Sequence, residues 1–354
     1  MNRKILLVIP LIFLALVLGT YDGLIRIGWD LPMNQSVAQH GVVMVGSFLV
    51  TLILLERIVI FKKTWLYIFP VLNGLSFLFF FTGKYHTGLQ LLLIGSGALA
   101  SIYVYLYVLH REAFLLIMLI GTIALTGGYI MLINLNLYPA AVPFWFAFIT
   151  FTVIGERLEL ARFLPQGHFK NNFLLLTIAL YFAGLLFNYH GSGHLLSGLS
   201  MILMTLWLAR FDIALKSVKM KGLHRYIASN LIAGYFWLAV TGILLFFAPV
   251  YSLVYDATLH AFFIGFMFSM IFAHGPIILP GVAGILKRPY HPVLYAWGAI
   301  LQFSLVMRIA CDFMEWTKLR EFSSLVNVIT VLGFFINVFI LMIAGAREPA
   351  KKPA

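Results

Sequence analysis

Histidines are the residues of this chain whose type and spacing could do chemistry. Neutral imidazole is a ligand of haem iron, copper and zinc, and the chain has ten histidines but one cysteine. That cysteine, Cys311, excludes an intrachain disulfide, a covalent C-x-x-C-H haem and a cysteine-bridged copper pair. Half of the histidines fall near one predicted surface: His40, His86, His190, His194 and His260. This grouping predicts an outward-facing metal or haem site.

His40 and His260 are predicted at matched depths. Each lies about one turn inside an apolar segment that enters the membrane from the outer side, 38–60 and 257–283. Two neutral imidazoles at one depth can ligate both faces of a haem iron, which favours a low-spin haem b. The alternative is a pair of interfacial histidines that bond water or carbonyl groups.

Arg308 is predicted about a turn and a half inside the outer end of another apolar segment. A haem propionate would give its guanidinium a bidentate carboxylate partner. Two alternatives stay open, an ion pair with Asp312 at i+4 and a side chain that snorkels to the interface.

His190 and His194 flank Gly191-Ser192-Gly193, which is typical of a turn. With His86 as a third ligand, they form a candidate copper site. A polar hairpin with incidental histidines is the alternative. His274 stands roughly 21 Å deeper than His260 at the α-helical rise, so it cannot belong to the same metal centre. We expect it to bond a carbonyl freed by Pro276 or Pro280, and the alternative is a proton relay or a second haem ligand.

The composition predicts an all-α, polytopic membrane protein. Hydrophobic residues make up 62% of the 354 residues, charged residues 10%, and the mean hydropathy is +1.00. About 20 helical residues cross a bilayer, and the apolar runs have that length without the alternation of a β-barrel. The predicted spans are 5–20, 38–60, 64–82, 88–109, 113–135, 139–160, 173–190, 194–212, 228–248, 257–283, 292–313 and 323–345.

Basic residues predict the orientation. With the N-terminus inside, nineteen of the 24 Lys and Arg residues fall on the cytoplasmic side, so the positive-inside rule places both termini in the cytoplasm. The net charge of +12 then reflects orientation and anionic lipid rather than nucleic acid. Residues 1–20 resemble a signal peptide, but no A-x-A site follows, and we expect them to be the first span. We predict one membrane domain over 1–346 and a short basic cytoplasmic tail over 347–354.

These features resemble known families. Twelve spans, with rim histidines on the second and tenth and a histidine cluster between the seventh and eighth, resemble subunit I of the haem-copper oxidases. Leu259 to Gly265 more closely resembles the H-A-x-x-V-G opening of span ten in NnrS-family proteins. Two further matches are Gln39 to Phe48, similar to that family's second span, and Leu305 to Arg308, similar to its L-L-R. The resemblance implies haem and copper binding in the bacterial cytoplasmic (inner) membrane, a link to nitric oxide or respiratory stress, and His40 and His260 as haem ligands.

The sequence also departs from these families. Predicted span six has no histidine, so the oxidase copper ligand is absent, and Thr258 stands where the oxidases have the first histidine of an H-x-H pair. The H-T-G-R end of the NnrS segment is missing too. We therefore do not expect oxygen reduction with proton pumping.

Three functions remain open at this stage. The first is a haem b-binding and copper-binding redox protein with electron transfer or nitric oxide chemistry at its outer face, working with respiratory or electron-donor subunits. The second is a non-catalytic protein that binds, senses or delivers haem or copper. The third is a secondary transporter with twelve spans, which would need broken helices and polar residues at the bilayer midplane.

Overall fold

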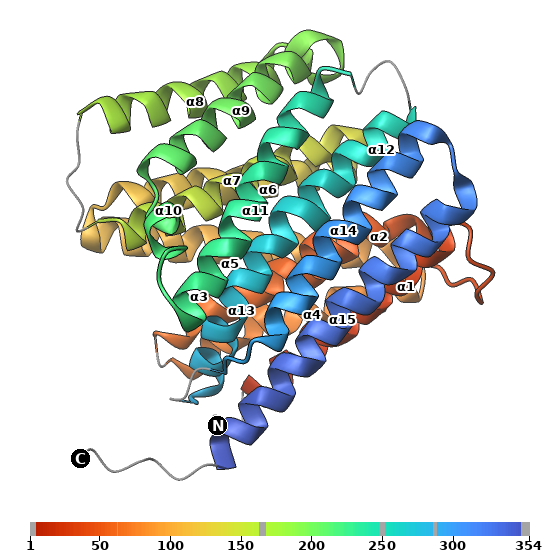
Figure 1. The fold of residues 1–354 in the computed structure, drawn as a ribbon, viewed down its shortest axis with the longest axis horizontal. Coiled ribbons are helices and arrows are strands. Elements are labelled where there is room, and N and C mark those ends of the chain that lie inside the picture. Colours follow the sequence, from red (N-terminus) through yellow and green to blue (C-terminus); the bar gives the residue numbers. More distant parts are fainter. Residues whose placement is uncertain (1–4, 62, 163–167, 248–251, 286–288, 348–354) are drawn as a thin grey trace. The chain divides into compact units, whose positions relative to one another are not determined.

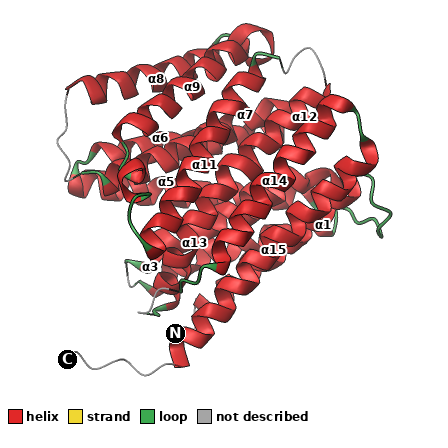
Figure 2. Ribbon diagram, in the orientation of Figure 1, coloured by secondary structure: helices red, strands yellow, loops and turns green. Residues whose placement is uncertain are grey.

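The structure is a computed structural model that describes residues 5–61, 63–162, 168–247, 252–285 and 289–347. Throughout these residues the secondary structure is helical (Figure 2). Within the described residues, twelve helices are long and apolar enough to cross a membrane, which agrees with the predicted all-α fold class and number of spans. The chain folds into two compact units, Met1–Leu164 and Pro165–Ala354.

The first unit holds six of the candidate spans. Its α6 and α7 pack along each other, and α4 packs against both α5 and the second span (Figure 1). The second span consists of α2, η2 and α3 in succession. The elements are α1 (Ile5–Ile27), η1 (Val37–Gln39), α2 (His40–Val42), η2 (Val43–Val50), α3 (Thr51–Val59), η3 (Thr64–Tyr67), α4 (Ile68–Phe81), α5 (Tyr85–His110), α6 (Ala113–Leu135) and α7 (Tyr138–Leu160).

The second unit holds the other six. Here α14 packs along α15, and α9 packs against both α8 and α11 (Figure 1). The tenth span consists of α12, η5 and α13. The elements are α8 (His168–Leu186), η4 (Asn188–Gly193), α9 (His194–Phe211), α10 (Ala214–Ser217), α11 (Gly222–Leu245), α12 (Ser252–His260), η5 (Ala261–Met267), α13 (Phe268–Ala283), α14 (Val293–Met314) and α15 (Thr317–Arg347).

Several spans extend beyond their predicted ends, and two of these extensions carry charged residues that are bonded inside the protein. The first helix continues to Ile27 instead of ending at residue 20, and the last begins at Thr317 instead of 323. The hydropathy of the sequence leaves the last turns of α1 and the first turn of α15 outside the predicted spans, because they carry Asp22 and Arg320. Both side chains nevertheless have bonded partners inside the protein. A polar residue with a bonded partner does not end a transmembrane helix.

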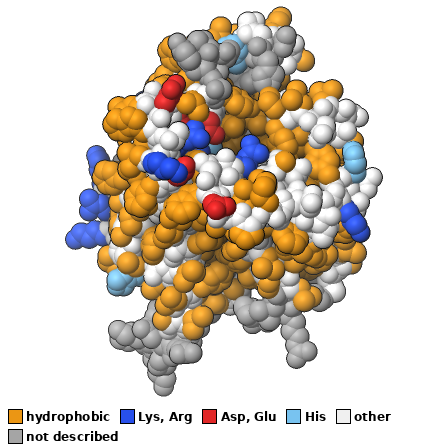
Figure 3. All heavy atoms as spheres, turned by 90° about the vertical axis from the view of Figure 1, so that its right-hand side faces the viewer, with side chains coloured by type: hydrophobic (Ala, Val, Ile, Leu, Met, Phe, Trp, Pro, Cys, Tyr) orange, Lys and Arg blue, Asp and Glu red, His pale blue; other side chains and the backbone are white. Residues whose placement is uncertain are grey.

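Hydrophobic side chains cover much of the face drawn in Figure 3, and charged side chains are few there. Large apolar residues are exposed on many helices, including Leu7 at 66% and Phe303 at 77%. Exposed apolar side chains in such numbers are unfavourable in water and favourable in lipid. The protein is therefore suited to a bilayer, where its outer surface contacts lipid.

Three segments of the described chain are π-helical, and each adjoins a histidine singled out above. Segment η2 follows His40 after two residues, η5 follows His260 directly, and η4 precedes His194. π-Helices are rare and are frequent at functional sites, because the extra residue re-aims the neighbouring side chains. The wide turns of η2 and η5 also bring a glycine, Gly46 or Gly265, against a neighbouring helix.

Alanine at Gly265 should destabilise the protein, whereas alanine at Gly281 should not. A β-carbon at Gly265 would lie 2.4 Å from Cγ of Trp237, and one at Gly281 would meet no atom within 4 Å. We expect Gly265→Ala to lower the free energy of unfolding by about 1–3 kcal/mol through overpacking. Gly281→Ala should leave it unchanged or raise it, because alanine has the higher helix propensity. Thermal unfolding in detergent compares the two variants, and equal melting temperatures would contradict the close packing of η5.

Candidate functional site

His40 lies in the first unit with its ring against α1. Its Nδ1 is 2.7 Å from the carbonyl oxygen of Gly19, and a β-carbon at Gly23 would lie 2.9 Å from its Cε1. Gly23 thus makes room for the imidazole, whereas a β-carbon at Gly19 would meet the side chain of Met44. A carbonyl oxygen can only accept a hydrogen bond, so Nδ1 carries the proton and Nε2 carries the lone pair.

The segment that leads into His40 is tied to α1 by a buried carboxylate. Asp22 is fully buried and accepts hydrogen bonds from Asn34 at 2.8 Å and from the hydroxyl of Ser36 at 2.7 Å. The Asn34 side chain also accepts from the backbone N–H of Ser36 at 2.7 Å, which closes an Asx turn. These bonds hold the polypeptide in a defined path up to the start of the second span.

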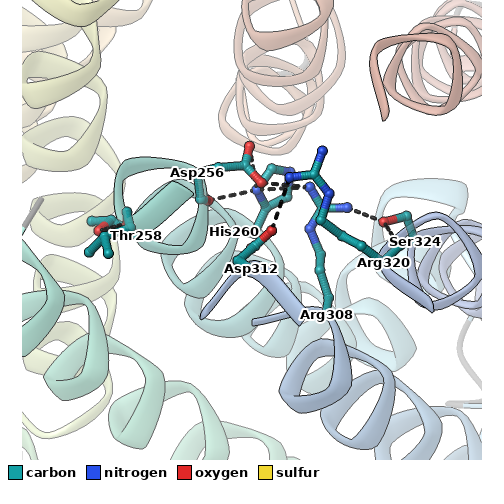
Figure 4. Close-up of polar contacts among 8 residues, drawn as sticks. Asp256, Thr258, His260, Arg308, Asp312, Arg320 and Ser324 are labelled. Carbon is teal, nitrogen blue, oxygen red and sulfur yellow. Dashed lines mark hydrogen bonds and ion pairs between the residues drawn. The ribbon is translucent and has the colours of Figure 1, made fainter. Parts of the chain in front are cut away.

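His260 lies in the second unit at the junction of α12 and η5 (Figure 4). Its Nδ1 is 2.8 Å from the carbonyl oxygen of Asp256, one turn earlier, and 3.5 Å from a carboxylate oxygen of the same residue. Arg308 approaches the same nitrogen at 3.4 Å. The two nearby oxygen atoms, the carbonyl and the carboxylate of Asp256, can only accept hydrogen bonds. Nδ1 of His260 therefore carries the proton, and its lone pair is on Nε2, as in His40.

Arg308 is held by two partners from other helices. Its Nη2 donates to the Asp256 carboxylate at 2.9 Å, and its Nη1 donates to the hydroxyl of Ser324 on α15. The alternative ion pair with Asp312 at i+4 is not the contact that forms, because Asp312 pairs instead with Arg320 at 3.3 Å. The side chain of Arg308 is 7% exposed, so it stays buried beside His260 and does not snorkel to the surface.

Asp256 and Arg320 are the members of this cluster whose role the sequence did not disclose. Asp256 is four residues before His260, a spacing that brings two helical side chains onto one face. This spacing was the feature of the sequence that could have indicated their contact. Arg320 falls between the predicted spans 292–313 and 323–345, but in the structure it lies on α15 and its side chain reaches Asp312 on α14. The cluster thus contains two cations, two carboxylates and one imidazole (Figure 4).

The three histidines of the predicted copper site have different environments. His86 is exposed in the first unit, with its ring centroid 5.6 Å from that of Tyr85, whereas His194 is buried in the second unit. The side chain of His190 lies outside the described residues. The turn predicted across Gly191-Ser192-Gly193 is wrong, because η4 continues into α9 without one. Within the described ranges, no three His, Cys, Asp or Glu side chains gather as a metal-binding group, and copper stays a prediction.

His274 repeats the arrangement of His260 deeper in the same span. Its Nδ1 is 2.8 Å from the carbonyl oxygen of Met270, again one turn earlier. His274 therefore bonds a backbone carbonyl oxygen, as predicted. The acceptor, however, is its own i−4 carbonyl, whereas Pro276 and Pro280 would free the carbonyls four residues before them.

Comparisons with known proteins place the chain in a family but do not indicate its activity. No curated protein and no solved structure matches it. One family model, described as Domain of unknown function (DUF8744), matches residues 3–343. Because this match covers nearly the whole chain and all twelve candidate spans, the protein belongs to the DUF8744 family.

Proposed function

We propose that this protein binds haem b in the bacterial cytoplasmic membrane, with Nε2 of His40 and Nε2 of His260 as iron ligands. One observation carries the proposal. Both imidazoles have Nδ1 on a backbone carbonyl, at 2.7 Å and 2.8 Å. Metal-ligating histidines are held in this way, because the bond selects the tautomer, orients the ring and raises its basicity. The residues present therefore fit the group.

The π-helices give independent support. Segments η2 and η5 adjoin His40 and His260 in two different units, and such segments cluster at functional positions. Ionisable residues within membrane spans are costly to bury and so tend to mark function. Bound haem would supply one-electron chemistry, and the protein would act in electron transfer or nitric oxide chemistry at the outer face.

The remaining parts of the proposal come from the sequence. The Lys and Arg distribution supports cytoplasmic N- and C-termini, which would place both histidines toward the outer surface. The resemblance to NnrS proteins and to haem-copper oxidase subunit I supports respiratory or electron-donor subunits as partners. It also supports a copper site at His86, His190 and His194. A non-catalytic protein that senses or delivers haem would use the same two ligands.

Absorption spectra and haem analysis of the purified protein test this proposal. We expect a Soret band that is shifted or lost in His40→Ala and in His260→Ala, since each substitution removes an iron ligand. His110→Ala is the matched control, because His110 is an exposed histidine at the end of α5. A colourless wild-type protein after expression with haem supplied, or a Soret band unchanged in both ligand variants, would refute it.

A secondary transporter is the second candidate, and the interrupted spans favour it. Transporters bind substrates where a transmembrane helix is discontinuous, and the second and tenth spans change from α- to π-helix and back. Haem content separates the two candidates, because a transporter of this kind needs no prosthetic group.

A further inference from the structure

The first unit contains a set of polar groups that the haem proposal does not use. They follow the second span and the helices around it, and we call them the polar column. Its members are Tyr138, Trp145, Tyr129, Ser47, Asn73, Thr51, Thr152 and Glu56. Polar groups buried in a membrane are unfavourable unless they are bonded or hydrated, so a continuous set of them needs an explanation.

The middle of the column is a hydrogen-bonded network between the second span and α4. The Asn73 amide donates to the carbonyl of Gly46 at 2.9 Å and to the hydroxyl of Thr51 at 2.8 Å. The hydroxyls of Ser47 and Ser76 are 2.6 Å apart. All four polar side chains are fully buried. The network thus connects η2 with the start of α3 across the centre of the span.

One end of the column reaches Tyr138. The hydroxyl of Tyr129 lies 2.9 Å from where a β-carbon of Gly46 would be, so it reaches the backbone of η2. Trp145 contacts Gly128, next to Tyr129, and also approaches Gly41. The rings of Trp145 and Tyr138 are 6.0 Å apart. This part of the column follows η2 towards the first residues of the span.

The other end reaches three carboxylates around Arg57. Its guanidinium is 3.1 Å from Glu156 and 3.7 Å from Glu159 on α7, and Glu56 lies within electrostatic reach of the same groups. Thr152 stands one turn before Glu156, on the face of α7 that meets Arg57. We take Thr152 as the next hydroxyl of the column on the side of the carboxylates.

Several column hydroxyls and one indole have no protein partner within the described part of the chain. They are Tyr129 Oη, Trp145 Nε1, Thr152 Oγ1 and Tyr138 Oη, and the Asn73 Oδ1 atom is unpartnered as well. Tyr129, Trp145, Thr152 and Asn73 are each more than nine-tenths buried. Buried polar groups of this kind are satisfied by internal water, which makes about three hydrogen bonds each. The unpartnered atoms therefore mark the places where water would complete the column.

From these contacts we propose that the polar column conducts protons through the first unit, between Glu56 and Tyr138. Tyr138 packs against Gly41 near the start of the second span, and Glu56 follows Gly41 by fifteen residues, a rise of roughly 22 Å at the α-helical 1.5 Å per residue. A proton that enters at one end is passed along hydrogen bonds of hydroxyls and water. Each group accepts one proton and releases another, so a single proton leaves at the far end and no electron moves. Asn73 occupies the middle of the path, where its amide donates to Gly46 and Thr51.

Proton flux into vesicles tests the proposal without any need for haem. The full chain is reconstituted into phosphatidylethanolamine and phosphatidylglycerol vesicles that contain a pH-sensitive dye, and a potassium gradient with valinomycin sets the potential. Wild-type vesicles should acidify faster than protein-free ones. Asn73→Leu should slow this flux by about tenfold or more, because a proton then has to pass an apolar group.

Two further variants keep the test decisive. Thr51→Val is isosteric and removes one hydroxyl, so it should also slow the flux if Asn73→Leu fails to fold. Asn327→Leu is the matched control, since Asn327 is a buried asparagine of the second unit that bonds Ser304 at 2.8 Å, and it should conduct like the wild type. Wild-type flux no faster than in protein-free vesicles, or equal flux in wild type and Thr51→Val, would overturn the proposal. The haem proposal would be unaffected.

Discussion

Replacing Arg320 by methionine should lower the melting temperature of the purified protein by about 10 °C. Arg320 pairs with Asp312 at 3.3 Å, and the Asp312 side chain is 1% exposed. Removing one partner of a buried ion pair costs about 3–5 kcal/mol, because the other charge stays buried without compensation. Thermal unfolding in detergent, followed by tryptophan fluorescence, measures the change.

Replacing the other partner, in Asp312→Asn, should lower the melting temperature less. The Arg320 side chain is 22% exposed, so in Asp312→Asn the guanidinium can turn towards water or lipid headgroups. The double variant Arg320→Met/Asp312→Leu should recover most of the lost stability, since no unpaired charge remains. Equal losses in the two single variants, or no recovery in the double variant, would contradict an ion pair whose carboxylate is the buried partner.

The helical fold and the number of spans were predictable because the hydropathy of a segment depends only on its own residues. Lipid solvates every exposed side chain, and only helices or closed barrels satisfy the backbone in lipid, so apolar length alone indicates a span. The ends of the spans were less predictable. The turns that carry Asp22 and Arg320 are helical because Ser36, Asn34 and Asp312 bond them, and those partners are 8 to 14 residues away in sequence.

The π-helical segments could not be predicted from periodicity. Apart from Ser47, the residues of η2 and η5 are apolar or glycine, so no amphipathic pattern records the extra residue of a wide turn. The π-helical segments instead coincide with close packing between helices, where Gly46 lies against Leu92 and Tyr129, and Gly265 lies against Trp237. An isolated glycine in each segment was the signal present in the sequence.

The environment of each histidine was predicted only in part. Depth followed from position along the span, and it singled out His40 and His260. Their partners did not follow, since the Gly19 carbonyl belongs to another helix and Asp256 had no assigned role. For Arg308, the protein partner considered from the sequence, Asp312, lies on its own helix, whereas the partner in the structure, Asp256, lies on another. Distances within one helix can be read from sequence, whereas contacts between helices depend on packing.

Asp256→Asn should weaken haem binding by about tenfold to a hundredfold, which is the usual effect of losing the carboxylate behind a ligating histidine. This prediction depends on the proposed function. The Asp256 carboxylate is 3.5 Å from His260 Nδ1 and 2.9 Å from Arg308. Asparagine keeps the volume and leaves the backbone carbonyl that accepts from His260, but it removes the negative charge from both contacts. The imidazole becomes less basic, and Arg308 keeps the Ser324 hydroxyl but loses its charge-assisted bond to the carboxylate.

Haem titration of the apoprotein, followed at the Soret band, gives the affinity, and thermal unfolding of the same apoprotein gives the stability. Glu321→Gln is the charge-matched control, because it removes one carboxylate from the same unit, where Glu321 pairs with the exposed Lys318 at 2.9 Å. Asp256→Asn should weaken haem binding and Glu321→Gln should not. Equal haem affinities in the two variants would remove Asp256 from the site. If Asp256→Asn binds haem more weakly while the melting temperature of its apoprotein is unchanged, the Asp256 charge acts on the iron-ligating histidine rather than on the fold. A role limited to the ion pair with Arg308 would instead lower the melting temperature whether or not haem is bound.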